Sequence, residues 1–272
     1  MTGPTVLVTG ATDGLGRGVA TALAGEGAAV LLHGRSPERL DSVVEEIGTE
    51  TGNANLRPYR ADLASLDDVR RLADEVVGQE SRLDALVNNA GIGTTLPGDG
   101  ERMVSADGYE LRFAVNYLAG FLLTHRLAEL LAASAPARIV NVSSAGQAPI
   151  DFDDVMLEHG YSGTRAYAQS KLAQVLFTFD LADELEDDGV TANCLHPATY
   201  MPTKIVLHAR GEGVTPLEDG VRATVRLVAS PELDGVTGAY FNGAREVRAD
   251  GQAYDADARR RLRELSARLT GV

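Results

Sequence analysis

The chain has 272 residues, 44% of them hydrophobic, and a formal net charge of −14. This length suits one α/β domain with a substantial core, and no repeat or Pro/Gly/Ser-rich linker divides it, so we expect one domain over residues 1–272. The negative charge argues against nucleic acid and anionic membranes as partners, because the field of the protein would repel both.

The single cysteine, Cys194, excludes an internal disulfide, and its apolar neighbours favour a place in the core. Residues 1–4 lead directly into a short apolar run, without the long hydrophobic region of a secretory signal. No stretch approaches the ~20 apolar residues that span a bilayer. The histidines and the acidic group at positions 151, 153 and 154 show no metal-ligand spacing. We therefore expect a cytoplasmic protein without a membrane span or a metal site.

Short β-branched runs alternate with longer amphipathic stretches along the chain. The expected strands are Thr5–Thr9, Ala29–His33, Leu56–Arg60, Ala85–Val87, Arg138–Val142, Thr191–Leu195 and Gly238–Phe241. The expected helices are Leu15–Glu26, Pro37–Glu50, Leu66–Glu80, Ala106–Ala133, Arg165–Asp187 and Leu217–Ala229. This alternation is typical of a parallel sheet covered on both faces, so we expect an α/β, Rossmann-type doubly wound fold. Ligands bind such sheets at the carboxyl ends of the strands.

A glycine-rich turn, TGATDGLG over Thr9–Gly16, follows the first expected strand and opens a helix. Glycines there allow a tight turn and let backbone N–H groups approach a pyrophosphate at the positive end of the helix dipole. The spacing G-x3-G-x-G differs from the commoner G-x-G-x-x-G, and a plain tight turn is the alternative. The expected dinucleotide contacts are Gly10, Thr12, Asp13, Gly14, Leu15 and Gly16.

The end of the second expected strand favours NADP(H) over NAD(H). NAD-binding folds usually place Asp or Glu there, whereas this chain reads Leu32-His33-Gly34-Arg35-Ser36. Arg35 offers a planar fork of donors and a permanent positive charge for a 2′-phosphate, and Ser36 could add a hydroxyl. The alternative is that Arg35 is a solvated residue ahead of the helix that begins at Pro37.

Two turns that follow later strands supply further candidate nucleotide contacts. Asp62 could accept a hydrogen bond from the adenine amino group with the Leu63 N–H nearby, or it could cap the following helix. Asn89, Ala90 and Gly91 are small or turn-forming residues that would let the chain pass close to the adenine ribose, unless they form a plain turn.

Tyr167 and Lys171 lie four residues apart at the start of an expected helix and therefore share one of its faces. A free tyrosine has a pKa of ~10, and a nearby lysine cation favours the phenolate, which suits a general acid/base. Tyr200 and Lys204 have the same spacing, but Pro202 between them and their loop-like surroundings argue against a shared helix face.

Polar residues from two other segments could complete a reaction centre. Ser143 and Ser144 end the fifth expected strand, where a hydroxyl could hold a carbonyl oxygen beside the phenol. Asn116 lies in an otherwise apolar stretch, where its amide could kink the helix, bind water or be satisfied by the protein itself.

Five separate motifs, taken in chain order, resemble the short-chain dehydrogenase/reductase family over essentially the whole chain. They are Thr9–Gly16, Asn88–Gly91, Asn116, Ser143/Ser144 and Tyr167/Lys171. The resemblance implies an enzyme that transfers a hydride between a nicotinamide cofactor and a carbonyl or alcohol carbon. It implies that Tyr167 is the acid/base, that Lys171 lowers the pKa of Tyr167 and holds the ribose, that Ser144 orients the substrate oxygen, and that Asn116 anchors a water.

Three features are similar to the retinol-dehydrogenase-like branch, which mostly uses NADP(H). They are the long gap between Ser144 and Tyr167, AYAQSKLA at 166–173 and GVTGAYF at 235–241. One departure follows the sixth expected strand, where the family's usual Pro-Gly is Pro197-Ala198. This change alters the loop beside the nicotinamide, where Pro197, Thr199 and Thr203 are candidate contacts.

We expect a mostly apolar carbonyl or alcohol substrate, because the loop after Gly91 and the insertions at about 145–166 and 196–215 carry many apolar side chains. These are Leu96, Ile150, Phe152, Tyr200, Met201, Ile205 and Val206. Two other functions are a non-redox dehydration, cyclisation or isomerisation on the same fold, and an NADPH-sensing module that acts on a protein partner. The resemblance implies a homodimer or homotetramer paired through the two long helices, which the loop before Tyr167 could obstruct.

Overall fold

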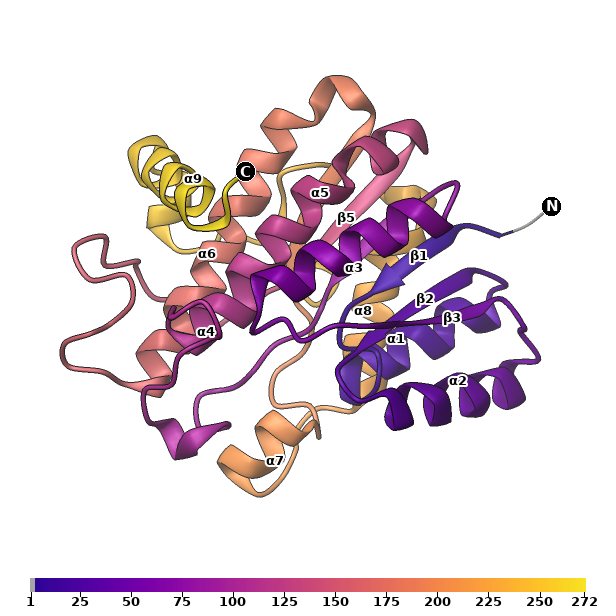
Figure 1. Ribbon diagram of the computed structural model, residues 1–272, viewed down its shortest axis with the longest axis horizontal. Helices are drawn as coiled ribbons and strands as arrows, with labels where there is room; N and C mark the ends of the chain where they lie inside the picture. The colour runs from indigo at the N-terminus through magenta and orange to yellow at the C-terminus, as the bar shows by residue number, and fades with distance from the viewer. Residues whose placement is uncertain (1–2) are drawn as a thin grey trace.

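The computed structural model describes residues 3–272; Met1 and Thr2, which belong to the segment expected to lead into the first strand, lie outside the described residues. The strands form an eight-stranded sheet with the order β3-β2-β1-β4-β5-β6-β7-β8 (Figure 1). Their bounds are β1 Thr5–Val8, β2 Ala29–Gly34, β3 Leu56–Arg60, β4 Ala85–Asn88, β5 Ala137–Val142, β6 Val190–His196, β7 Tyr240–Asn242 and β8 Arg245–Glu246. All neighbours pair in parallel except β7 and β8.

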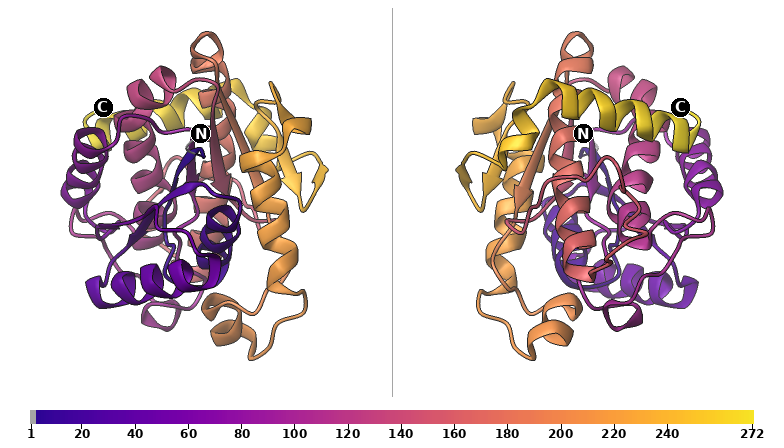
Figure 2. Two further views of the ribbon diagram at one scale, coloured as in Figure 1. Left: turned by 90° about the vertical axis from the view of Figure 1, so that its right-hand side faces the viewer. Right: turned by 90° about the vertical axis from the view of Figure 1, so that its left-hand side faces the viewer.

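Helices cover both faces of this sheet, as Figure 2 shows. Their bounds are α1 Gly14–Gly25, α2 Pro37–Thr51, α3 Leu66–Gln79, α4 Leu111–Phe113, α5 Ala119–Ala133, α6 Gly163–Glu184, α7 Lys204–Arg210, α8 Leu217–Ala229 and α9 Ala256–Thr270. The expected α/β doubly wound fold is confirmed. None of the helices between residues 3 and 272 combines the length and the apolar character that crossing a membrane requires.

Alternate residues of each strand point into two separate cores. Leu7 packs with residues of α3, α5 and α6, whereas Val6 and Val8 pack with α1, α2 and α8. Cys194 is buried in the first core, as expected. This two-sided burial explains why the strand sequences are almost continuously apolar.

Serine caps begin several helices at the expected places. Ser36 Oγ accepts from Arg39 N at the start of α2, and Ser65 Oγ accepts from Asp68 N at the start of α3. The alternative that Asp62 caps α3 is therefore wrong, because Ser65 holds that position.

The expected helix over residues 106–133 is wrong in its first part. Residues 106–110 form a turn in which Gly108 has φ +83° and Val104 bridges to Glu110. The Glu110 side chain then accepts from Phe113 N and begins α4, which continues through a π-helical turn, Ala114–Leu118, into α5. The long helix was also expected to pair with α6 across a dimer.

The sequence pattern did not predict α7, α9 or β8. Asp255 caps the start of α9, where its carboxylate accepts from two backbone N–H groups, and the helix packs along α6. Tyr117 Oη hydrogen bonds to Ser266 Oγ at 2.7 Å, and Arg263 pairs with Asp180 at 3.1 Å. α9 therefore covers part of the α5–α6 face that we expected to pair between subunits.

Candidate active site

The candidate residues meet at the carboxyl edge of the parallel sheet. The glycine-rich turn follows β1, Arg35 follows β2, Asn89 follows β4, Ser144 follows β5 and Pro197 follows β6. This edge is where open α/β sheets bind their ligands, so the topology brings together segments that lie far apart in the sequence.

The glycine-rich turn leaves no room for side chains on its inner surface. A Cβ at Gly10, where φ is +67°, would lie 2.9 Å from Ala90 Cα, and one at Gly16 would lie 2.3 Å from Gly10 O. Asn89 Nδ2 donates to Thr9 O at 2.8 Å, and Thr9 Oγ1 accepts from the backbone N–H groups of Asn89 and Ala90. Two sequence motifs are thus joined into one backbone cradle, which fits a dinucleotide pyrophosphate.

His33 supports the same cradle, and the sequence analysis did not identify this role. Its Nδ1 accepts from Gly10 N–H at 3.2 Å, and its Nε2 donates to Ala61 O at 3.2 Å. The imidazole is fully buried, and this burial lowers the pKa of His33 to about 4. A neutral ring therefore holds the glycine turn in place. The sequence feature that could have indicated this role is a histidine in an otherwise apolar strand.

Asp13 caps α1 by accepting from Gly14 N at 2.8 Å. Its carboxylate also pairs with Lys204 at the start of α7 and with Arg39 at 3.5 Å. Burial opposes ionisation, but the Lys204 ammonium and the Gly14 N–H outweigh it and lower the pKa of Asp13. Thr203 packs against Gly14, so the segment that carries α7 lies directly over the glycine turn.

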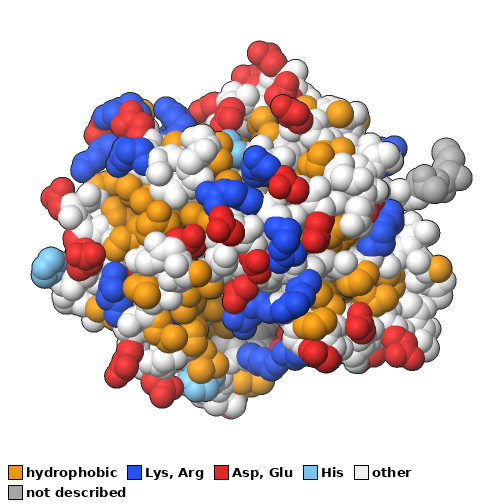
Figure 3. Space-filling model, in the orientation of Figure 1, with side chains coloured by type: hydrophobic (Ala, Val, Ile, Leu, Met, Phe, Trp, Pro, Cys, Tyr) orange, Lys and Arg blue, Asp and Glu red, His pale blue; other side chains and the backbone are white. Residues whose placement is uncertain are grey.

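The end of β2 carries a group of exposed guanidinium ions. Arg35 forms no ion pair with any residue between positions 3 and 272, and Arg60, paired with Gly34 in the sheet, donates from Nε to Arg35 O at 3.3 Å. Arg39 lies one helical turn beyond Arg35. Figure 3 shows Lys and Arg side chains gathered between α7 and α2 on this face. Sequence analysis missed Arg39 and Arg60, although their positions at the start of α2 and the end of β3 are compatible with such a cluster.

Two expected cofactor contacts are engaged in local turns. Ser36 Oγ donates to Glu38 Oε2 at 2.7 Å while it caps α2. Asp62 Oδ1 accepts from Ala64 N at 3.0 Å, and Leu63 is buried. Thr12, Leu15 and Gly16 lie in the glycine turn and the first turn of α1, where the sequence placed them.

Tyr167 and Lys171 share one face of α6, as their spacing predicts. The Lys171 ammonium lies 5.7 Å from the centroid of the Tyr167 ring. Burial raises the pKa of Tyr167 above its ordinary value although a hydrogen bond with Ser144 acts in the opposite direction, so the expected lowering by Lys171 is not found in this structure. Burial also lowers the pKa of Lys171 to about 7. The phenol, the ammonium and the Ser144 hydroxyl therefore form one group.

The two adjacent serines have different surroundings. Ser143 is buried, and its Oγ donates to Lys171 O at 2.7 Å. Ser144 is partly exposed beside Tyr167, and its backbone carbonyl accepts from Tyr240 Oη at 3.0 Å. Ser143 thus anchors α6 to β5, and Ser144 presents its hydroxyl to the phenol.

Asn116 lies in the π-helical turn, and the protein satisfies its amide. Oδ1 accepts from Ile92 N at 2.8 Å, and Nδ2 donates to Ile92 O at 3.1 Å and to Ser170 Oγ at 3.0 Å. A Cβ at Gly91 would lie 3.2 Å from Asn116 Oδ1 and 3.6 Å from Lys171 Nζ. Asn116 therefore holds the chain after Gly91 against the Tyr167–Lys171 group; its expected water contact stays a prediction.

The loop after β6 carries the expected nicotinamide-side residues. Pro197 is buried, and Thr199 Oγ1 lies 3.0 Å from His196 Nε2. Tyr200, with φ +53°, stacks its ring on Arg210, whereas Lys204 pairs with Asp13. This second Tyr–Lys pair does not share a helix face, in agreement with the expectation from Pro202.

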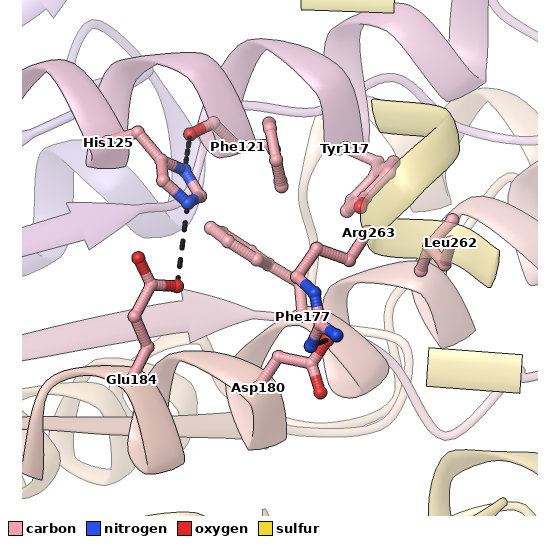
Figure 4. Close-up of a pocket in the computed structure, with 8 residues that line it drawn as sticks. All are labelled: Tyr117, Phe121, His125, Phe177, Asp180, Glu184, Leu262 and Arg263. Carbon is pink, nitrogen blue, oxygen red and sulfur yellow. Dashed lines mark hydrogen bonds and ion pairs between the residues drawn. The ribbon is translucent and has the colours of Figure 1, made fainter. Parts of the chain in front are cut away.

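A separate pocket lies between α5, α6 and α9 (Figure 4). Tyr117, Phe121 and Phe177 form its aromatic wall, and His125 Nε2 lies 3.6 Å from Glu184 Oε2 at its rim. None of the expected catalytic or cofactor-binding residues lines it. The candidate catalytic and cofactor-binding residues therefore lie at the sheet edge and not in this pocket.

Comparison with known proteins agrees with this geometry. The profile of the short chain dehydrogenase family matches residues 4–210. Retinol dehydrogenase 13 of Mus musculus is 40% identical over 288 residues, which cover 99% of this chain and 84% of that protein, and retinol dehydrogenase 14 of Homo sapiens is 37% identical over 300 residues, which cover 100% and 88%.

Solved structures lead to the same family. A short chain dehydrogenase from Escherichia coli CFT073, solved in complex with NADPH, has 28% identity and a TM-score of 0.72, with 89% of this chain and 97% of that chain covered. An uncharacterized protein from Mycobacterium paratuberculosis has 26% identity and a TM-score of 0.78, with 99% and 94% covered. This chain therefore belongs to the short-chain dehydrogenase family, resembles its retinol dehydrogenases, and is an oxidoreductase that acts on alcohol or carbonyl groups with a nicotinamide cofactor.

Proposed function

We propose that the protein is an NADP(H)-dependent oxidoreductase for mostly apolar carbonyl or alcohol compounds, with Tyr167 as the general acid/base. The observation that carries this proposal is the convergence of Tyr167, Ser144 and Lys171 beside the glycine cradle. The bound nicotinamide supplies or accepts the hydride at the substrate carbon.

The protein's own groups would handle the substrate oxygen and its proton. In the reducing direction, the Ser144 hydroxyl donates a hydrogen bond to the carbonyl oxygen, and Tyr167 Oη transfers its proton to that oxygen as the alcohol forms. The Lys171 ammonium stabilises the phenolate that remains until solvent returns the proton. In the oxidising direction, the phenolate removes the alcohol proton.

The preference for NADP(H) rests on the arginines at the end of β2. Arg35 stands where NAD-selective folds usually place a carboxylate, and Arg39 and Arg60 flank it. Three guanidinium groups favour a ligand that carries a 2′-phosphate. The structures of the related Escherichia coli and Shigella flexneri dehydrogenases with NADPH and NADP support this choice.

An apolar substrate is supported by exposed aromatic and apolar side chains on the segment after β6. These are Tyr200, Leu207 and Val214, whereas Ile150, Val155 and Met201 are buried in the two cores. The names of the retinol dehydrogenases support the same substrate class. Burying an extended hydrocarbon against such side chains would provide most of the binding energy.

The test follows absorbance of reduced nicotinamide while the protein receives NADPH or NADH with a panel of apolar aldehydes and ketones. We expect faster oxidation of NADPH than of NADH, and loss of at least about a hundredfold in rate for Tyr167→Phe, because general acid catalysis contributes on this scale. Tight NADPH binding without consumption across the panel would favour a non-redox reaction instead.

A further inference from the structure

A buried ionic cluster lies behind the substrate side of the site. Arg112 is 0% exposed and Glu110 is 1% exposed, and both belong to the start of the α4 segment. Arg112 Nε donates to Gly93 O at 2.7 Å, Nη2 donates to Thr94 O at 3.0 Å, and Nη1 donates to Tyr161 Oη at 2.7 Å. One guanidinium thus connects three segments of the chain.

Tyr161 completes the cluster as a bridge between the two charged side chains. Its hydroxyl accepts from Arg112 and donates to Glu110 Oε1 at 2.9 Å, while Glu110 Oε2 accepts from Phe113 N at 2.7 Å. Burial and the neighbouring carboxylate raise the pKa of Tyr161 to about 12, so the phenol keeps its proton. Each charged group therefore has a defined partner, which a buried ion pair requires.

The cluster acts on the stretch of backbone that leaves the catalytic centre. Ile92 O accepts from Asn116, and the next two carbonyls, Gly93 O and Thr94 O, accept from Arg112. Three consecutive carbonyls are thus held by side chains of one helical segment. This arrangement links the position of the Tyr167–Lys171 group to the position of the loop after Gly91.

The held backbone is also the contact point of the other pocket walls. A Cβ at Gly93 would lie 2.4 Å from Ile205 Cγ2 on α7, and a Cβ at Gly163 would lie 2.1 Å from Thr94 O. α7 and the beginning of α6 therefore pack directly on the carbonyl-bound segment. A shift of residues 93–94 would displace both walls, because close packing transmits strain.

We propose that Arg112, bridged to Glu110 by Tyr161, is a positioning residue that sets the shape of the substrate pocket without contacting substrate or cofactor. The guanidinium binds the two successive carbonyls and the phenol through three different nitrogens in a fixed plane, a geometry that the single nitrogen of lysine does not reproduce. The kinetic part of the test rests on the proposed function, because KM can be measured only if the protein reduces a carbonyl compound.

The test compares Arg112→Lys and Tyr161→Phe with Arg138→Lys. Arg138 is a matched control, because it also binds two backbone carbonyls, Leu227 O and Ser230 O, and a carboxylate, but at the amino end of β5. The measurements are KM and kcat for the best carbonyl substrate, the Kd of NADPH from the fluorescence of the reduced nicotinamide, since the chain has no tryptophan, and amide hydrogen exchange of residues 92–104 and 155–165.

We expect Arg112→Lys to raise the substrate KM by about tenfold and to accelerate exchange in both segments, with a smaller change in the NADPH Kd than in KM, because no hydrogen bond of the cluster reaches the glycine turn itself. Tyr161→Phe, which keeps the ring, should change both quantities in the same direction by less. Arg138→Lys should leave KM and the amide hydrogen exchange rates of both segments unchanged.

An unchanged exchange rate in both variants, or an NADPH Kd that rises in parallel with KM, would overturn the proposal. If the wild-type protein reduces no carbonyl compound, the proposed function fails, and the exchange and NADPH measurements still decide the positioning role.

Discussion

Gln174 Oε1 lies 2.9 Å from Lys171 Nζ, one helical turn further along α6. Val142 O accepts from the same ammonium at 2.9 Å, so both partners of the buried charge are neutral dipoles. Because no carboxylate compensates burial, the pKa of Lys171 falls to about 7. The third N–H of Lys171 has no acceptor among residues 3–272 and remains available beside Gly91 and Tyr167.

Replacing this amide tests whether Gln174 sets the protonation of the site. Gln174→Leu removes an acceptor that favours the charged amine, so the pKa of Lys171 should fall further. We expect the alkaline limb of the pH–kcat profile to move to lower pH, with roughly tenfold lower activity at pH 8, because a hydrogen bond to a charged group contributes about 1.5–3 kcal/mol. Thr178→Val, which removes a buried hydroxyl from the next turn of α6, is the control. An alkaline limb that stays in place in Gln174→Leu contradicts this role.

His33 should make the stability of the glycine cradle depend on pH. Its folded-state pKa of about 4 lies below the ordinary value of 6.5, so between these values the unfolded chain binds a proton that the folded protein does not. The stabilisation is therefore present above pH 6.5 and is lost as pH falls toward 4, at up to ~1.4 kcal/mol per pH unit. Urea unfolding should show that the free energy of unfolding of His33→Leu is about 1–3 kcal/mol below that of wild type at pH 7.5. This difference between the two proteins should be smaller at pH 5.

His125 provides a control of opposite sign. Burial disfavours its charged form, but the Glu184 carboxylate and the hydrogen bond to Phe121 O outweigh burial and raise the pKa of His125 (Figure 4). Its stabilisation is present below the ordinary value of 6.5 and is lost as pH rises through the folded pKa. His125→Gln should therefore differ most from wild type at low pH. If wild type and His33→Leu differ in free energy of unfolding by the same amount from pH 5 to pH 7.5, the His33 imidazole does not titrate as proposed.

The parallel sheet and the glycine turn could be predicted from the sequence because their signals are local. Val6, Leu7 and Val8 form a continuous apolar run because both faces of β1 are covered. The glycine spacing likewise indicates where the backbone must pass close to another segment. In the same way, the spacing of Tyr167 and Lys171 on a helix follows directly from the helical repeat.

The remaining parts depend on contacts between distant segments. α9 has a strongly charged sequence and is held by Tyr117 and Asp180, which lie far away in the chain. α7 has only seven residues, too few for a stable isolated helix, and relies on Lys204 and Ile205 for its contacts. Arg112 lies in a stretch that resembles an ordinary amphipathic helix. No short-range pattern marks it as the link between two pocket walls.

Arg35 should determine the choice between the two nicotinamide cofactors. Arg35→Asp replaces a cation at the end of β2 with a carboxylate, which would repel a 2′-phosphate and could accept from a ribose hydroxyl. We expect NADPH affinity to fall between roughly tenfold and a hundredfold, with little change or a gain for NADH, as titrations that follow the fluorescence of the reduced nicotinamide would measure. Arg17→Ala, which removes an exposed arginine that pairs with Glu46 on the neighbouring helix, should leave the ratio of NADPH affinity to NADH affinity unchanged. Equal losses for both cofactors would assign the specificity to other residues.

Lys204 should neutralise a carboxylate that would otherwise oppose cofactor binding. Asp13 is ionised in the turn that faces the expected pyrophosphate, and Lys204 pairs with it from α7. In Lys204→Ala, Asp13 keeps its ion pair with Arg39 at 3.5 Å but loses the Lys204 ammonium. Its less neutralised charge should weaken NADPH binding by about three- to tenfold relative to wild type, and the defect should shrink between about 0.02 M and 0.2 M salt, because added ions screen exposed charges.

The double variant Asp13→Asn/Lys204→Ala separates charge from helix contact. Asparagine can still cap α1 but carries no charge, so NADPH affinity should return toward wild type if repulsion by Asp13 causes the defect. If the double variant binds NADPH as weakly as Lys204→Ala does at low salt, the defect comes instead from displacement of α7. In that case the packing of Thr203 on Gly14 would be the important contact between α7 and the cradle.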